Sequence, residues 1–211
     1  MYTIYMSITK PTQAEERALW ALGHQYVAGV DEVGRGSWAG PIVAGAVILP
    51  PDFDPKVVRD SKTLSPKQRE KMFVYITRGA VAWAAGVVSA EEIDREGISA
   101  ANTKAMILAL ERLPVTPDAV LVDAVRLRFR EKPVKAVIRG DATILAIAAG
   151  SIVAKVVRDT LMQGEHRLYP AYGLAGHKGY GTKDHEAALR THGLTPIHRR
   201  SFQPMKSLVN R

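Results

Sequence analysis

The sequence predicts a single α/β domain, in which helices flank a mixed five-stranded sheet and a further helical segment lies at the C-terminal end. Three apolar, β-prone runs lie close together in the first part of the chain. Two shorter runs follow, separated from the first three by stretches with helical periodicity. This order is typical of a mixed sheet covered by helices. A length of 211 residues suits one domain.

Capping signals predict where the helices begin. Thr12 and Glu15 have the spacing of a capping box before an apolar-periodic stretch. Ser65 followed by Pro66 is a good helix start, because proline is favoured in the first helical turn. In chain order, we expect helices over residues 13–22, 65–77, 89–94, 99–113, 143–162 and 184–192.

Short apolar runs predict the strands. Pro50 and Pro51 end the second run. No internal linker is evident, so we expect a helical extension at residues 1–25 and a main domain over residues 26–211. The five predicted strands cover residues 26–30, 42–49, 80–88, 119–122 and 134–138.

Composition narrows the functional classes. The chain has no cysteine, which excludes disulfides, zinc thiolates and a cysteine nucleophile. It has no recognisable secretory signal and no apolar stretch of the ~20 residues that a membrane span needs, so we expect a cytoplasmic protein. The formal net charge of +8 favours a polyanionic partner such as nucleic acid, although a need for solubility alone would also account for it.

Four acidic residues follow apolar, strand-like runs, where acidic residues should be rare: Asp31, Glu32, Asp123 and Asp141. Side chains at strand ends converge on a cleft in α/β proteins. Clustered carboxylates repel one another, and burial raises the cost, so they need a cation. Oxygen-only ligands favour Mg²⁺ or Mn²⁺. Two such ions form the usual clamp for phosphodiester cleavage.

Geometry limits how neighbouring acids can share one site. Side chains that are adjacent in a strand point to opposite faces. Asp31 and Glu32 can therefore face one cleft only if the strand ends or bulges there, and Gly34 and Gly36 provide the necessary backbone freedom. An acid after a strand is also commonly a loop residue or a helix cap, without any metal. Asp141, before a long helix, could be an N-cap.

The chain resembles ribonuclease HII, whose signature is Asp-Glu-x-Gly-Arg-Gly. The similarity begins with residues 27–49, VAGVDEVGRGSWAGPIVAGAVIL, and extends in order over about residues 26–206. The other segments that carry it are Asp60-Ser61-Lys62, Gly97-Ile98 with Ala101-Asn102, Leu121-Val122-Asp123, Gly140-Asp141 with residues 148–156 and Arg158-Asp159, Tyr172-Gly173, residues 177–182 and residues 198–202.

The resemblance implies an RNase H-like fold, with residues 26–211 as the type 2 catalytic domain. It also implies an endoribonuclease that cleaves the RNA strand of RNA/DNA hybrids. The same enzyme would cut on the 5′ side of ribonucleotides embedded in duplex DNA, leaving 3′-hydroxyl and 5′-phosphate ends. Carried over by position, the metal-binding and catalytic carboxylates, which would hold two Mn²⁺ or Mg²⁺ ions, are Asp31, Glu32, Asp123 and Asp141.

The resemblance also implies which residues bind the substrate. Gly34, Arg35 and Gly36 would form the loop that senses the ribose 2′-hydroxyl, mainly through backbone groups. Tyr180 would stack on the sugar of the following deoxynucleotide, although without the family match a packed loop tyrosine would be the favoured interpretation. Lys62 is a further candidate for a phosphate contact. Arg35 could bind a phosphate or cap its loop.

The chain departs from the family pattern at three places. Ser37-Trp38 follows the signature where Pro-Leu is usual, and Gly150 stands where alanine is typical. Ala124 replaces the common glycine after the third acid. Ala124 removes backbone freedom beside Asp123, where the predicted strand ends.

Three alternative functions fit the sequence less well. A catalytically inactive, basic nucleic-acid-binding module is disfavoured because all four acids are present. Ribonuclease HIII has a large N-terminal substrate-binding domain, and only about 25 residues precede the first strand here. An integrase or resolvase acting on DNA alone would not need a loop that senses a 2′-hydroxyl. From the family, we expect a monomer whose partner is an RNA/DNA hybrid or ribonucleotide-containing duplex DNA.

Overall fold

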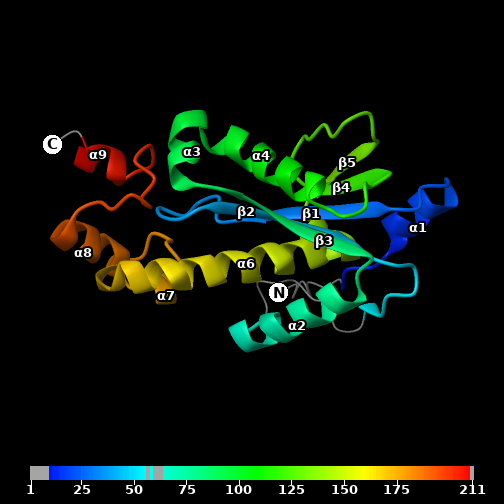
Figure 1. The fold of residues 1–211 in the computed structure, drawn as a ribbon, viewed down its shortest axis with the longest axis horizontal. Coiled ribbons are helices and arrows are strands. Elements are labelled where there is room, and N and C mark those ends of the chain that lie inside the picture. The colour runs from blue at the N-terminus through cyan, green and yellow to red at the C-terminus, as the bar shows by residue number, and fades with distance from the viewer. Residues whose placement is uncertain (1–9, 56–57, 59–63, 210–211) are drawn as a thin grey trace, which may run out of the picture.

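A central five-stranded sheet with helices on both faces forms the core of the computed structural model, which describes residues 10–55, 58 and 64–209 (Figure 1). The strand order is β3-β2-β1-β4-β5. β2 runs antiparallel to both β1 and β3, whereas β4 runs parallel to β1 and β5. The predicted mixed sheet is therefore confirmed. The strands are β1 (Val27–Val33), β2 (Ile42–Ile48), β3 (Ala82–Val88), β4 (Ala119–Asp123) and β5 (Val134–Val137).

Two long helices cover the two faces of the sheet, α4 on one side and α6 on the other (Figure 1). Within the part of the chain that the structure describes, no helix is long and apolar enough to cross a membrane. The helices are α1 (Ala14–Ala21), α2 (Pro66–Gly79), α3 (Ala90–Glu96), α4 (Ile98–Glu111), α5 (Gly140–Thr143), α6 (Leu145–Leu168), the 3-10 helix η3 (Pro170–Tyr172), α7 (Leu174–His177), α8 (Lys183–His192) and α9 (Met205–Val209).

One of the two predicted helix caps forms and the other does not. The Ser65 hydroxyl accepts a hydrogen bond from the Gln68 amide at 3.3 Å, and the Gln68 side chain accepts one from the Ser65 amide at 2.9 Å. These two bonds complete a capping box. The box predicted at Thr12 is wrong, because the N-cap of α1 is Gln13, which makes no side-chain cap bond. Thr12 instead pairs through its backbone with the segment around Ile144.

The helix α1 caps a distant helix instead of capping itself. The buried Glu16 carboxylate accepts a hydrogen bond from the Ala146 amide at 2.8 Å, in the first turn of α6. The N-cap of α6, Ile144, has no side-chain cap bond of its own, so Glu16 satisfies one of the amides that the helix leaves unpaired. Burial raises the pKa of Glu16. A domain boundary at residue 26 stays a prediction.

The long helix α6 lies in direct backbone contact with the sheet. A Cβ atom on Gly29 would lie 2.1 Å from the Ala146 carbonyl carbon, and one on Gly45 would lie 2.3 Å from the Gly150 oxygen. A Cβ on Gly150 itself would meet the Gly45 oxygen at 2.7 Å. The glycine that replaces the family's usual alanine at position 150 therefore belongs to this close contact, which places the start of α6 tightly against β1 and β2.

The helix predicted over residues 143–162 differs from the observed one at both ends. It continues to Leu168, and its N-terminal end is separated from the short helix α5 by Ile144, which has an extended conformation at φ −114° and ψ 126°. The Ile144 amide and carbonyl still bond along the chain, to Gly140 and Ala148. The break turns α5 away from α6 and positions Asp141 in a helical turn of its own.

Candidate active site

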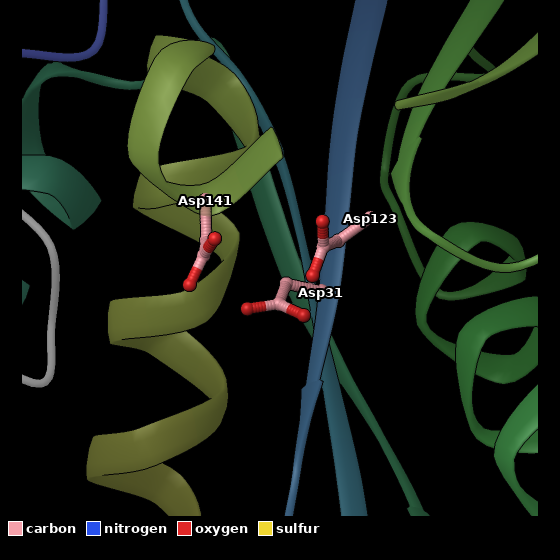
Figure 2. A group of neighbouring side chains, drawn as sticks. All are labelled: Asp31, Asp123 and Asp141. Carbon is pink, nitrogen blue, oxygen red and sulfur yellow. The ribbon is translucent and has the colours of Figure 1, made fainter. Parts of the chain in front are cut away.

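Three aspartates converge at one edge of the sheet (Figure 2). The parallel pairing of β1 and β4 joins Val30 to Val122, and the next residues along the two strands are Asp31 and Asp123. Both lie on the face covered by α6, and Asp141 faces them from α5. Each of the three offers a carboxylate oxygen within 4.8 Å of the others.

Glu32 is not part of this group of three, and the strand end or bulge expected at Asp31 does not form. β1 neither ends nor bulges at Asp31, because its pairing with β2 stays regular through Val33. Alternation along a regular strand directs Glu32 to the face opposite Asp31. There its carboxylate hydrogen-bonds the side chain of Asn102 in α4. Glu32 still lines the same cleft as Asp31 and Asp123.

The cleft at this end of the sheet encloses about 500 Å³. Acidic side chains from β1 and β4 line it together with basic side chains from α2 and α6. A volume of this size admits part of a polynucleotide strand. The residues that line it are Asp31, Glu32, Val33, Gly34, Arg35, Gly36, Arg69, Asp123, Ser151, Lys155 and Tyr180.

Burial, and after it the crowding of the carboxylates, perturbs their protonation. Burial raises the pKa of Asp31 to about 8, and the neighbouring charges of Glu32 and Asp123 add to the rise. A hydrogen bond from the Ser151 side chain opposes it. Burial likewise raises the pKa of Glu32, while the Arg35 guanidinium lowers it. Full ionisation of such a group requires a nearby positive charge, and a set of buried carboxylate oxygens fits a hard divalent cation.

A backbone amide holds Asp123 in place, and a short helix carries Asp141. The Asp123 carboxylate accepts a hydrogen bond from the Gly140 amide at 2.7 Å, which ties the end of β4 to α5. The alternative that Asp141 is an N-cap is wrong, because Arg139 is the N-cap of α5 and Asp141 lies within the helix. Ala124 adopts a left-handed conformation with φ +47°. Glycine, the family's usual residue at this position, adopts this conformation without steric cost.

The predicted substrate-binding residues lie around the same cleft. Gly34 is buried and has φ +90°, a conformation that favours glycine. Arg35 and Gly36 are exposed, and Tyr180 is half-buried. All four line the cleft with the acids. Lys62 lies outside the described residues.

Some residues that shape the cleft were not predicted as site residues. Ser151 and Lys155 lie one turn apart on α6, and Ser151 bonds Asp31. The Lys155 ammonium forms an ion pair with Asp159 at 2.7 Å, and Arg69 of α2 approaches the same carboxylate at 3.9 Å. The only signal in the sequence was a polar residue, Ser151, within an otherwise apolar stretch of small residues.

The fold and the acidic cleft define an RNase H-like nuclease. The sequence model of the family "Ribonuclease HII" matches residues 28–205. The chain belongs to this family, and it is an endoribonuclease that cleaves the RNA strand of RNA/DNA hybrids.

Relatives support this assignment over nearly the whole chain. The ribonuclease HII of Roseiflexus castenholzii is 51% identical over 205 residues, which cover 95% of this chain and 92% of that protein. The ribonuclease HII of Dehalococcoides mccartyi is 46% identical, with coverage of 95% and 96%. Among solved structures, ribonuclease H2 from Pyrococcus horikoshii superposes with a TM-score of 0.76 at 27% identity, covering 88% of this chain and 98% of that one. Bst-RNase HIII in complex with Mn²⁺ has the same fold, with a TM-score of 0.68 at 22% identity over 94% of this chain and 73% of that one.

Proposed function

We propose that this enzyme cuts on the 5′ side of ribonucleotides in a duplex, both in RNA/DNA hybrids and in DNA with embedded ribonucleotides. The products would carry 3′-hydroxyl and 5′-phosphate ends. The observation that carries the proposal is the position of three converging aspartates beside a loop that exposes its backbone at Gly36. The first feature suits phosphodiester hydrolysis, and the second suits recognition of a 2′-hydroxyl.

The proposed metal ligands are Asp31, Glu32, Asp123 and Asp141, with Mn²⁺ or Mg²⁺ as the cofactor. The three aspartates fit a first cation directly. Glu32 lines the cleft from the opposite face of β1 and would contribute to a second position. Divalent cations bound there would activate the attacking water and stabilise the leaving 3′-oxygen. Bst-RNase HIII in complex with Mn²⁺ is a precedent within the same fold.

The protein's own groups would keep these ligands in position. Ser151 and the Glu32 amide, which donates to Asp31 at 2.7 Å, fix the orientation of the Asp31 carboxylate. Asn102 fixes Glu32 from α4. Such supporting hydrogen bonds reduce the reorganisation that a reaction would otherwise require. Asn102 is buried, so a role in holding Glu32 is favoured over direct contact with substrate.

Recognition of ribose is assigned to Gly34, Arg35 and Gly36, and recognition of the following sugar to Tyr180. The 2′-hydroxyl is the group that distinguishes RNA from DNA at a given nucleotide. Loss of its hydrogen bonds would leave polar groups unpaired at a cost of ~1–3 kcal/mol, which alone gives about ten- to hundredfold selectivity. Larger selectivity would require the 2′-hydroxyl to help assemble the metal site. Lys62 keeps its proposed role as a phosphate contact.

A monomeric enzyme in the cytoplasm completes the proposal, and both features are expected from the family. The alternative is a basic module that binds nucleic acid without cutting it. The raised pKa of Asp31 favours the enzyme, because a mere binding surface for polyanions has no need of buried acids.

A cleavage assay separates these functions. The protein would be incubated with Mg²⁺ or Mn²⁺ and one of three duplexes: an RNA/DNA hybrid, DNA with a single ribonucleotide, and DNA alone. We expect cutting of the first two, on the 5′ side of the ribonucleotide in the second, and no cutting of the third. Equal cutting of the last two would disprove ribose recognition, and binding without cutting would favour the inactive module.

A further inference from the structure

The elements proposed to recognise the ribose and the following sugar meet at a buried arginine, Arg158 of α6, which is fully shielded from solvent. Its guanidinium donates to the carbonyl of Pro41 at 2.9 Å, to that of Ala39 at 3.2 Å and to that of Lys178 at 2.9 Å. The guanidinium carbon also lies 5.3 Å from the centre of the Tyr180 ring. One side chain thus joins the segment after the Gly-Arg-Gly loop to the segment that carries Tyr180.

Arg158 also supports the loop itself. A Cβ atom on Gly34 would lie 2.2 Å from the Arg158 Nε, so the guanidinium packs directly against the backbone of the loop. In the described part of the chain no carboxylate bonds to it, and its partners are backbone carbonyls and an aromatic face. Burial lowers the pKa of Arg158. A buried cation whose hydrogen bonds all go to neutral carbonyl groups is costly, which argues against a purely stabilising role.

Further contacts connect the same two segments, residues 34–41 and residues 178–181, and this connection is called the joint below. The amides of Trp38 and Ala39 both donate to the Gly179 carbonyl, at 2.8 and 3.2 Å. The Trp38 indole packs against the backbone at Gly181, where a Cβ would come within 2.3 Å of the ring. Arg158 differs because it contacts both Gly34 and the Tyr180 ring, the two groups that line the cleft.

We propose that Arg158 is a positioning residue that fixes the distance between the Gly-Arg-Gly loop and the Tyr180 ring. It would thereby determine specificity for a ribonucleotide followed by a deoxyribonucleotide. This inference rests on the proposed function of the two elements. A junction substrate must place a 2′-hydroxyl on the loop and the next sugar on Tyr180 at the same time. A long hybrid offers a 2′-hydroxyl at every position of its RNA strand, so it depends less on this spacing.

The test compares Arg158→Lys with the wild-type enzyme on DNA holding a single ribonucleotide and on a long RNA/DNA hybrid. Lysine keeps the charge but cannot bridge three carbonyls in a fixed plane. We expect kcat/KM on the single-ribonucleotide duplex to fall about tenfold more than on the hybrid, mainly through kcat. Arg112→Lys is the matched control, because the Arg112 guanidinium also bonds a backbone carbonyl, that of Ala85 at 2.9 Å, away from the cleft.

A double-mutant cycle shows whether Arg158 acts through Tyr180. In a Tyr180→Ala background, Arg158→Lys should have little further effect on the ratio of the two activities. Equal losses on both substrates, or independent effects of the two substitutions, would overturn the proposal. Failure of the proposal for Arg158 can be distinguished from failure of the proposed function. If the wild-type enzyme cuts the single-ribonucleotide duplex but not DNA alone, the proposed function stands whatever the Arg158 variant does.

Hydrogen exchange tests the joint without a variant, should the lysine protein not fold. The Trp38 amide bonds Gly179, and the Tyr180 amide bonds the His177 carbonyl at 3.0 Å. If the two segments form one unit, both amides should exchange with the same opening free energy. Clearly different opening free energies would overturn the proposal.

Discussion

Replacing Asp31 by asparagine should abolish cleavage and, in the absence of metal, stabilise the fold. Asp31 is only 5% exposed, and burial raises its pKa to about 8. In the unfolded chain its pKa is about 3.9. Because the folded pKa is the higher one, the folded state favours the protonated acid. The stability that the protonated Asp31 side chain contributes is fully present below about pH 4 and is lost as the pH rises to about 8.

The size of the effect follows from this difference in pKa. A pKa difference of about four between the folded and unfolded states corresponds to at most roughly 5–6 kcal/mol of folding free energy, which is lost when Asp31 ionises. The ionised carboxylate accepts hydrogen bonds from Ser151 and from the Glu32 amide, and the single oxygen of asparagine replaces these incompletely. We therefore expect Asp31→Asn to raise the free energy of unfolding by about 2–3 kcal/mol at alkaline pH.

Urea unfolding in EDTA at about pH 5 and about pH 9 measures the effect. The gap between the variant and the wild type should widen as the pH rises, whereas the exposed Asp52→Asn should show no such change. Added Mn²⁺ should stabilise the wild type by about 2.7 kcal/mol at a hundredfold excess over Kd, and the variant by less. If both proteins have the same pH dependence in EDTA, or gain equally from Mn²⁺, the reasoning about this cluster is refuted.

Two further predictions concern backbone strain and buried histidines. Ala124→Gly should raise the free energy of unfolding by about 0.5–1 kcal/mol, because relief of the left-handed conformation at φ +47° exceeds the entropy cost of glycine. Thermal unfolding checks this against the exposed helical control Ala187→Gly, which should be destabilised by about 1 kcal/mol, and a loss in both would contradict it. Burial and then the neighbouring His185, whose Nε2 lies 3.1 Å from that of His198, lower the pKa of His198 to about 4. Its neutral form therefore contributes up to about 3 kcal/mol that is present above about pH 6.5 and lost as the pH falls toward 4. Urea unfolding as a function of pH should show a weaker dependence in His198→Gln but not in His24→Gln, and an unchanged dependence in both would refute this.

The sequence by itself determined which segments form strands, where most helices lie and the type of chemistry. Apolar runs that end in acids predicted which strands carry the site, because a charged group in a buried strand needs a specific reason to be there. Two of the three aspartates, Asp31 and Asp123, follow from this argument alone. The Ser65 cap also follows from local sequence, since all of its partners lie within one helical turn.

The tertiary structure alone decided how these groups are oriented. Whether Asp31 and Glu32 share a face depends on where β1 ends, and that is set by its pairing with β2, which continues to Val33. Asp141 reaches the site because the chain breaks at Ile144, where backbone bonds to Thr12 replace a continuous helix. Arg158 joins segments that lie 117 and 20 residues away in the chain. Such contacts leave no local pattern, because burial and register are properties of the folded chain and not of neighbouring residues.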